Sequence, residues 1–233
     1  MLALIVAGGT GSRFSRSVKK QFYPLGDKPL FYYPCHIFHD YPGIKGMVVA
    51  LPAQQVKKYA RLCHTWFPRF PVHVVAGGKT RCHSVFNALE KAQDMAGASV
   101  LISDAVRPFI RHAQVDRLRA ACAGVAGAVP VLPVADTLVY GQKGGIAGYA
   151  DRNGLFRVQT PQLFNKRILF QLMGDIDLTD PRYTDESSIC YYNKQPVALV
   201  PGDTLNVKIT FKQDLPFLIH LFDGFFSKQG YRR

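Results

Sequence analysis

The sequence predicts an α/β protein arranged as a three-layer sandwich, with a mostly parallel sheet covered by helices on both faces. Short apolar, β-branched runs alternate with longer amphipathic segments, and several of the runs end in glycine-rich or charged loops. This alternation is typical of βαβ units, in which a helix connects one strand to the next parallel strand. The 233 residues are 48% hydrophobic, enough for a sizeable core, so we expect one globular domain over residues 1–233.

Five segments are predicted to form the central strands, because each is a nearly continuous apolar run, as in strands buried on both faces. In chain order they are ALIVAGG at 3–9, GMVVALP at 46–52, VHVVAGG at 72–78, SVLISDA at 99–105 and GAVPVLPV at 127–134. The apolar periodicity elsewhere predicts helices over 54–66, 80–95, 113–123 and 211–226. Pro216 falls inside the last of these, which leaves the start of that helix open.

The segment TLVYGQKGGIAGYAD at 137–151 breaks this alternation. Strand-like ends flank a glycine-rich centre, which predicts a β-hairpin projecting from the sheet. Strand edges exposed in this way tend to pair with another chain. We therefore expect residues 137–151 to form an arm within the domain that mediates dimerisation.

Composition limits the class of protein. A net charge of +13 permits nucleic acid, an anionic membrane surface or phosphorylated small molecules as partners, but the basic residues are spread along the chain rather than gathered in a stripe. We therefore expect no nucleic acid or membrane partner. The five cysteines are scattered, no apolar run approaches the ~18 residues of a membrane span, and the N-terminus lacks signal-peptide features, so we expect a cytoplasmic protein. The histidines show no ligand spacing and are interpreted as ordinary.

Three of the predicted strands end in loops that contain glycines and charged residues of the kinds found in binding and catalytic sites. They are AGGTGSR after the first strand, AGGKTRCHS after the third and SDAVRP after the fourth. Ligands of an open parallel sheet bind beyond the carboxyl ends of its strands. We therefore expect these three loops to line one site.

The first loop is neither a P-loop nor a Rossmann fingerprint, since Phe14 stands where the third glycine of that fingerprint belongs. Gly8 and Gly9 still allow backbone N–H groups to approach a phosphate closely. Arg13 and Lys20 can place positive charge on a phosphoryl group. The alternative is a flexible surface loop with incidental basic residues.

The other two loops extend this chemistry. Gly78, Arg81 and Ser84 lie where a helix is predicted to begin, a position that receives anions and polar base edges, although a plain turn would show the same pattern. Asp104 at a strand end can bind Mg²⁺ that bridges triphosphate oxygens, and Arg107 can bind a second phosphorylated substrate. A purely structural pair of Asp104 and Arg107 is the alternative.

Taken together, these residues resemble a known family. The motifs AGGTGSR, KKQF, GGKTRCHSV, DAVRPF, PVADT, DRNGLF, QTPQLF, TDESS and NVKIT occur in the order found in 2-C-methyl-D-erythritol 4-phosphate cytidylyltransferases and the related ribitol-5-phosphate cytidylyltransferases. The resemblance covers nearly the whole chain and implies a nucleotidyltransferase (Rossmann-like) fold. It also implies transfer of the cytidylyl group of CTP to methylerythritol phosphate, with release of pyrophosphate, in the non-mevalonate route to isoprenoid precursors. Two alternatives stay open: a ribitol-5-phosphate cytidylyltransferase and, from a different class, a basic nucleic-acid-binding protein.

The same resemblance assigns roles to individual positions. Its catalytic residues fall on Arg13, Lys20, Arg152 and Lys208. Its nucleotide-binding residues fall on Ala7, Gly8, Gly9, Gly78, Arg81 and Ser84. Its polyol-phosphate-binding residues fall on Asp104, Arg107, Thr137, Arg152, Thr160 and Lys208, with Asp104 as the ligand of Mg²⁺ or another divalent cation. In the family the arm, with Thr137 and Arg152, crosses to the partner subunit of a homodimer.

The chain departs from the family pattern at three positions. Lys19 replaces a proline before the catalytic lysine, Lys79 replaces an acidic residue after the double glycine, and Ser103 replaces a histidine before Asp104. We expect these changes to loosen one loop and to alter one polar contact to the nucleotide, but they remove no group that the chemistry needs. A first loop without carboxylates suits a reaction between two anions, and the attacking phosphate, with a second pKa near ~6, needs no general base.

Overall fold

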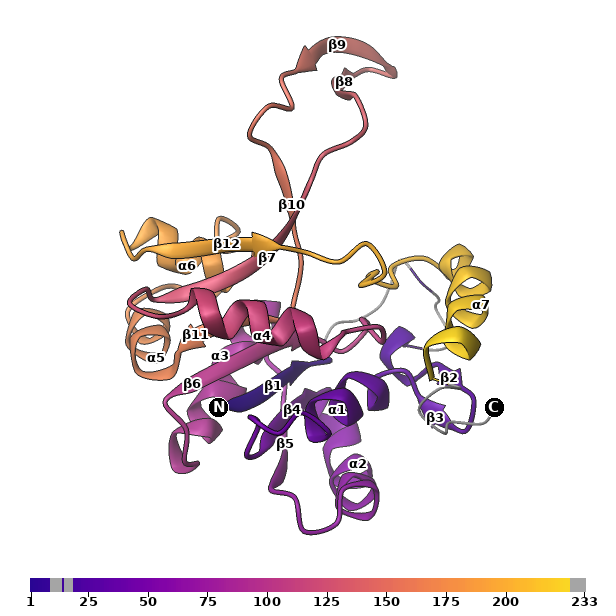
Figure 1. The fold of residues 1–233 in the computed structure, drawn as a ribbon, viewed down its shortest axis with the longest axis vertical. Helices are drawn as coiled ribbons and strands as arrows, with labels where there is room; N and C mark the ends of the chain where they lie inside the picture. The colour runs from indigo at the N-terminus through magenta and orange to yellow at the C-terminus, as the bar shows by residue number, and fades with distance from the viewer. Residues whose placement is uncertain (9–13, 15–18, 227–233) are drawn as a thin grey trace.

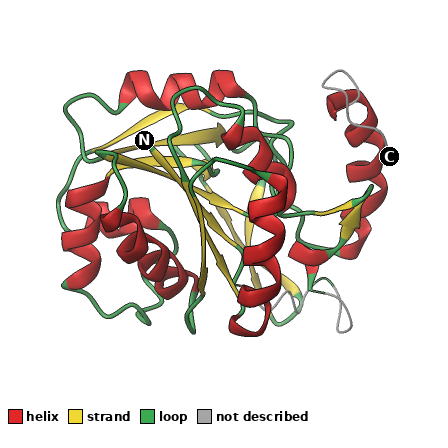
Figure 2. Ribbon diagram, turned by 90° about the horizontal axis from the view of Figure 1, so that it is seen from below, coloured by secondary structure: helices red, strands yellow, loops and turns green. Residues whose placement is uncertain are grey.

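The structure is a computed structural model that describes residues 1–8, 14 and 19–226. These residues form an α/β sandwich around an eight-stranded sheet (Figures 1 and 2). The strands of that sheet are β1 (Leu2–Val6), β4 (Met47–Leu51), β5 (Val72–Ala76), β6 (Ser99–Asp104), β7 (Gly127–Pro133), β10 (Phe156–Val158), β11 (Gln162–Asn165) and β12 (Val197–Pro201). Their spatial order is β10-β7-β11-β6-β1-β4-β5, and β12 pairs with β7.

The centre of the sheet is parallel, as predicted. β1 pairs in parallel with β4 and with β6, so that Ile5 lies between Val49 and Ser103, and β4 pairs in parallel with β5. All five predicted strands are present. The sequence analysis missed β10, β11 and β12. β11 lies antiparallel between β6 and β7, and β10 is antiparallel to β7.

Helices cover both faces of this sheet (Figure 2). Four of these helices were predicted, namely α2 (Ala53–Trp66), α3 (Arg81–Lys91), α4 (His112–Ala121) and α7 (Leu215–Phe226). Pro216 lies in the first turn of α7, where its missing N–H costs no helical hydrogen bond. Helices α1, α5 and α6 were not predicted. The helices of the described residues are α1 (Tyr32–His39), α2 (Ala53–Trp66), α3 (Arg81–Lys91), α4 (His112–Ala121), α5 (Lys166–Gly174), α6 (Glu186–Tyr192) and α7 (Leu215–Phe226). Short elements complete the chain: η1 (Lys20–Phe22), β2 (Pro24–Leu25), β3 (Lys28–Pro29), η2 (Ala92–Asp94) and η3 (Lys212–Asp214).

Alternate side chains of the strands point to opposite faces of the sheet and contribute to two separate hydrophobic cores. On β1, Ala3 and Ile5 belong to the core that receives α1, α2, α4 and α7. Leu2 and Leu4 belong to the core that receives α3, α5 and α6. Both cores are fully buried along β1, so the strand ends beyond them are held in fixed positions. Among the described residues, no helix has both the length and the apolarity needed to cross a membrane.

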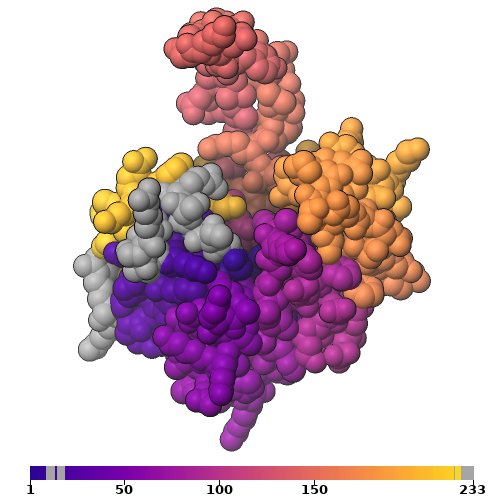
Figure 3. All heavy atoms as spheres, turned by 180° about the vertical axis from the view of Figure 1, so that it is seen from behind, coloured from indigo at the N-terminus to yellow at the C-terminus, as the bar shows by residue number. Residues whose placement is uncertain are grey.

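The predicted hairpin is present and projects from the body of the molecule (Figures 1 and 3). Its strands β8 (Leu138–Gln142) and β9 (Gly145–Ala150) pair antiparallel. The turn between them consists of Lys143 and Gly144, both with positive φ (49° and 82°), as a two-residue type I′ turn requires. The projecting arm of the predicted fold is thus confirmed, whereas its role in dimerisation stays a prediction.

Candidate active site

A cavity of about 520 Å³ lies at the carboxyl ends of β1 and β6. Its described lining contains four basic residues, Lys20, Lys79, Arg81 and Lys208, and one acidic residue, Asp104. The remaining lining is small or uncharged: Val6, Ala7, Gly8, Gln21, Gly78, Thr80, Ala105 and Val106. All three loops that the sequence analysis singled out therefore contribute to one cavity, and its charge suits a polyanion.

The glycines of the cavity are required by the contact between two loops. A Cβ atom on Gly8 would lie 2.7 Å from Ser84 Oγ, and one on Gly77 would lie 2.9 Å from it. Ser84 Oγ accepts a hydrogen bond from the Gly78 N–H (3.0 Å) and donates one to the Thr80 carbonyl (2.9 Å). The loops that follow β1 and β5 are thereby packed together around a buried hydroxyl. The sequence analysis explained Gly8 by the close approach of a ligand, and the structure adds this packing reason.

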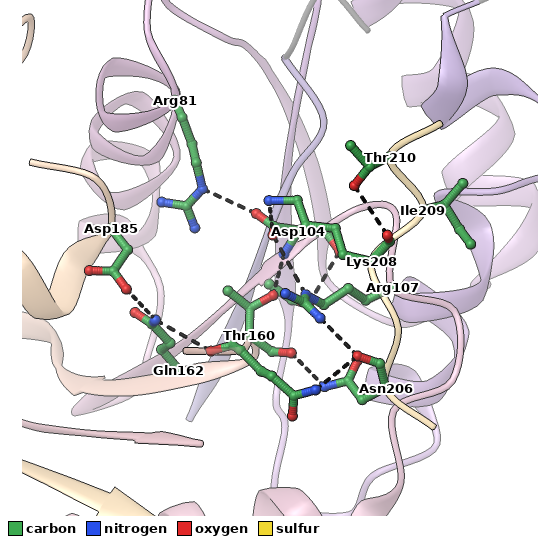
Figure 4. Close-up of polar contacts among 12 residues, drawn as sticks. Arg81, Asp104, Arg107, Thr160, Gln162, Asp185, Asn206, Lys208, Ile209 and Thr210 are labelled. Atoms are coloured by element: carbon green, nitrogen blue, oxygen red, sulfur yellow. Dashed lines mark hydrogen bonds and ion pairs between the residues drawn. The ribbon is translucent and has the colours of Figure 1, made fainter. Parts of the chain in front are cut away.

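Asp104 is the centre of a cluster of charged side chains (Figure 4). Its Oδ1 accepts a hydrogen bond from Arg81 Nε (3.1 Å), and its Oδ2 lies 2.8 Å from Lys208 Nζ and 3.6 Å from Arg107 Nε. Its backbone N–H donates to Thr160 Oγ1 (3.1 Å). Burial raises the pKa of Asp104, but the three cations reverse this effect and hold the pKa well below its usual range. The carboxylate is therefore ionised at neutral pH.

A second carboxylate, which the sequence analysis missed, completes this cluster. Glu186 is the first residue of α6, and its side chain is 1% exposed. It accepts two hydrogen bonds from Arg81, at 2.6 Å (Nη1 to Oε1) and 3.2 Å (Nη2 to Oε2). Burial lowers the pKa of Arg81, but Glu186 and Asp104 more than reverse that shift, so the guanidinium stays charged. Arg81 is thus held rigidly between two carboxylates.

Lys20 and Lys208 both line the cavity, and a hydrogen bond ties Lys20 to the segment that carries Lys208. Lys20 Nζ donates to the carbonyl of Ile209, the residue that follows Lys208 (3.3 Å). Gln21 Nε2 donates to the Ala7 carbonyl (2.7 Å), which ties η1 to the end of β1. Both predicted catalytic lysines therefore line the cavity, carried by segments far apart in the sequence.

Other predicted site residues lie elsewhere. Gly9 and Arg13 fall outside the described residues. Thr137 and Arg152 lie at the base of the hairpin, are exposed, and are absent from the lining of the cavity. Arg152 Nη1 donates to the Ala135 carbonyl at that base. The structure therefore does not bring these two residues to the cavity of their own chain.

The three departures from the family pattern differ in position. Lys79 lines the cavity and adds to its positive charge. Ser103 is fully buried, so its side chain is covered by protein rather than offered to the cavity. Lys19 is exposed, and its carbonyl accepts a hydrogen bond from the Phe22 N–H (2.9 Å) at the start of η1. The backbone around Lys20 is therefore ordered by this hydrogen bond without a preceding proline.

A second cavity, of about 620 Å³, shares Lys208 with the first. Arg107 and Arg157 add positive charge to its lining. Arg107 is 7% exposed, and its Nη1 donates to the Asn206 carbonyl (2.8 Å), which fixes the guanidinium between the two cavities. Two basic cavities that meet at Lys208 provide room for two anionic ligands.

Comparisons with known proteins agree with this geometry. A family model described as 2-C-methyl-D-erythritol 4-phosphate cytidylyltransferase (IspD) matches residues 1–219. The enzyme of that name from Bacillus pumilus is 32% identical over 213 residues, which cover 91% of this chain and 92% of the relative. A bifunctional IspD/IspF enzyme from Sinorhizobium medicae is 35% identical over 91% of this chain but only 54% of its own length. The chain thus spans about half the length of the bifunctional relatives it matches.

Solved structures show the same similarity. A crystal structure of 4-diphosphocytidyl-2C-methyl-D-erythritol synthase superimposes with a TM-score of 0.80 at 30% identity, covering 95% of this chain and 97% of the other. The 2-C-methyl-D-erythritol 4-phosphate cytidylyltransferase of Thermus thermophilus gives a TM-score of 0.75 at 30% identity, over 95% and 98% of the two chains. The nucleotidyltransferase fold implied by the sequence resemblance is therefore confirmed.

Proposed function

The chain belongs to the 2-C-methyl-D-erythritol 4-phosphate cytidylyltransferase family, a family of cytidylyltransferases, and we propose that it transfers the cytidylyl group of CTP to 2-C-methyl-D-erythritol 4-phosphate. The products are 4-diphosphocytidyl-2-C-methyl-D-erythritol and pyrophosphate, in the synthesis of isoprenoid precursors. One observation carries the proposal. The described lining of the cavity at β1 and β6 holds four basic residues against one carboxylate, as binding of a triphosphate requires.

In the proposed reaction, an oxygen of the acceptor phosphate attacks the α-phosphorus of CTP. The bond from that phosphorus to the bridging oxygen breaks, and its electron pair leaves with pyrophosphate. The acceptor phosphate is already ionised at neutral pH, so no general base is needed. The barrier comes from repulsion between two anions and from charge that accumulates on the α-phosphoryl oxygens. Lys20 lines the cavity where it can stabilise that charge, and Arg13 is assigned the same role.

The acceptor phosphate is assigned to Asp104, Arg107, Thr160 and Lys208. Support comes from Lys208, which lines both cavities, and from Arg107, whose guanidinium is fixed between them. A phosphate held there lies next to the cavity proposed for CTP, which is the proximity that the reaction needs. Asp104 holds the Lys208 ammonium and the Arg107 guanidinium in place, because its Oδ2 lies 2.8 Å from Lys208 Nζ and 3.6 Å from Arg107 Nε.

The nucleotide is assigned to the loops after β1 and β5. Ala7, Gly8, Gly78 and Arg81 line the first cavity, and Ser84 holds the two loops together. Gly9 is assigned to the same group, from outside the described residues. Arg81 is fixed by two carboxylates and offers the nucleotide a positive charge of constant orientation.

Mg²⁺ or a similar divalent cation is proposed as a companion of CTP. Mg²⁺ keeps several water ligands and is usually held by one or two carboxylates together with substrate phosphates. In the described lining, Asp104 is the single carboxylate, and Arg81 and Lys208 occupy positions 3.1 and 2.8 Å from its oxygens. This donor set fits an ion that enters bound to the triphosphate better than an ion enclosed by protein. Asp104 would hold the ion, and the ion would neutralise charge on the phosphate oxygens of CTP.

The arm is proposed to pair two chains. Thr137 and Arg152 are exposed at its base, outside their own cavity, so they are available to the acceptor site of a partner chain. The exposed apolar residues of β8 and β9 support the same proposal, since an exposed apolar patch is typical of an interaction surface.

The test follows pyrophosphate release from CTP and Mg²⁺ with each acceptor in parallel. We expect kcat/KM for methylerythritol phosphate to exceed that for ribitol 5-phosphate by at least ~10²-fold, because mispaired hydroxyl groups in a polar pocket are costly. A higher value for ribitol 5-phosphate would replace the acceptor but keep the reaction class. No release with either acceptor, together with salt-dependent RNA binding, would refute the enzyme and favour the nucleic-acid-binding alternative.

A further inference from the structure

The last turn of α1 gathers two histidines and an aspartate, away from the cavity at Asp104. His36 Nε2 lies 3.0 Å from Asp40 Oδ2, and His39 Nδ1 lies 2.8 Å from Asp40 Oδ1. One potential ligand atom from each residue lies within 4.8 Å of the other two. Positions i, i+3 and i+4 of a helix share one face, which explains the grouping. The sequence analysis found no ligand spacing among the histidines, whereas the structure places these two close to one carboxylate.

Aromatic neighbours hold both imidazole rings in place. The His36 ring stacks on Tyr32, with centroids 5.8 Å apart and an interplanar angle of 4°. The His39 ring lies 5.3 Å from Phe67 and 4.9 Å from Phe70. Rings fixed in this way lose little rotational freedom when they bind a ligand. The donor atoms are therefore oriented before any ion arrives.

The electrostatics of this turn favour a cation. Asp40 is the C-cap of α1, where the helix dipole already places partial negative charge. Two imidazole nitrogens and one carboxylate form a donor set that suits zinc, nickel and copper ions.

We propose that His36, His39 and Asp40 bind a divalent transition-metal ion of the zinc, nickel or copper class at the end of α1. Three protein ligands leave further coordination positions to water, and the Asp40 side chain, 45% exposed, gives the ion access from solvent. None of the three residues lines the two cavities assigned to substrates, so the proposal is independent of the proposed function. The ion would fix the end of α1 and stabilise the fold.

The single tryptophan of the chain provides a local probe of this site. The Trp66 ring lies 5.2 Å from Tyr32, the ring on which His36 stacks. A bound Cu²⁺ ion quenches the fluorescence of a nearby indole. Titration of the full chain with CuCl₂ should therefore give saturable quenching at one ion per chain. A parallel titration with ZnCl₂ should raise Tm by about 5 °C or more at 100 times Kd.

Variants separate this site from adventitious binding. H39A and D40N should each weaken Cu²⁺ and Zn²⁺ binding at least tenfold, with an unchanged circular dichroism spectrum as the check on folding. H64A is the matched control, since His64 is an exposed histidine on α2 only two residues before Trp66, and it should bind as wild type does. No saturable binding to wild type, or equal binding by wild type and H39A, would overturn the proposal.

Discussion

The charged cluster around Asp104 and the projecting hairpin of β8 and β9 are built in opposite ways. In the cluster, each charge meets an opposite charge within the same chain. Glu186, Arg81, Asp104 and Lys208 form a continuous series of contacts of 2.6, 3.1 and 2.8 Å. Both carboxylates are almost completely buried. The chain alone thus fixes the orientation of these groups before any substrate binds.

The hairpin carries apolar side chains that its own chain does not cover. Val139 is 46% exposed, Tyr140 and Ile146 are each 64% exposed, and Tyr149 is 70% exposed. Figure 3 shows the hairpin standing clear of the body of the molecule. The contrast separates a region whose groups are fixed by partners in the same chain from a region whose apolar surface the same chain leaves exposed. Changes in the cluster should affect the chemistry and stability of one chain, and changes in the hairpin should affect association.

The largest expected effect is on catalysis. Lys20→Ala should lower kcat by ~10²-fold or more, because it removes a positive charge from the cavity that we propose binds the α-phosphoryl group. Arg13→Ala is expected to act in the same way. Steady-state pyrophosphate release gives kcat, and thermal unfolding checks that the fold is unchanged.

Lys19→Ala is the matched control for this prediction. It removes the same charge one residue earlier, from an exposed side chain, and should leave kcat within about twofold of wild type. A Lys20→Ala enzyme with the kcat of wild type would exclude Lys20 from the mechanism.

The next effect is on stability. Glu186→Gln should lower the free energy of unfolding by about 2–4 kcal/mol, because the half-buried Arg81 guanidinium would then make its two hydrogen bonds to a weaker, neutral partner. Urea unfolding measures the change. Asp180→Asn is the control, since its pair with Arg182 is only partly buried (side chains 26% and 54% exposed) and should contribute less than about 1 kcal/mol. Equal losses in the two variants would show that the buried cluster contributes no more to the free energy of unfolding than the partly exposed pair does.

The pH dependence of stability gives a third test of the cluster. The pKa of Asp104 is held low in the folded protein, so its stabilisation is present above the unfolded value of about 3.9 and is lost as the pH falls. Asp104→Asn should therefore be less stable than wild type at neutral pH. Below pH 4 the difference should shrink, by at most about 1.4 kcal/mol per pH unit. Urea unfolding at pH 7, 5, 4 and 3 measures it, and a difference that stays constant would contradict this account.

The sequence predicted the central strands because buried parallel strands are continuous apolar runs, and β1 and β4 show this pattern throughout. It missed β11 because QLFN is short and lacks a clear alternation, and its place between β6 and β7 depends on pairing with residues that are distant in the sequence. The hairpin was predicted correctly because its signal is local, in the turn glycines and their flanking strands.

The site residues were likewise predicted where their signal is local and missed where it depends on distant residues. The strand-end loops carry Lys20, Arg81 and Asp104 in recognisable motifs, and the topology brings them to one cavity. Glu186 could not be assigned a partner, because Arg81 lies 105 residues away and the pairing depends on the fold placing the first residue of α6 opposite the first residue of α3. The sequence shows which residues carry charge, whereas burial and tertiary packing decide which of them pair.

The smallest expected effect on the single chain, and the one that separates the two regions most clearly, comes from the hairpin. Deleting residues 142–145 should change the free energy of unfolding of the isolated chain by less than about 0.5 kcal/mol, because exposed turn residues contribute little to the core. The same deletion should weaken the dimer in sedimentation experiments and raise KM for the polyol phosphate. Lys143→Asn, which suits the left-handed turn, should behave as wild type does. A deletion variant that sediments and turns over like wild type would contradict the assignment of assembly to the hairpin.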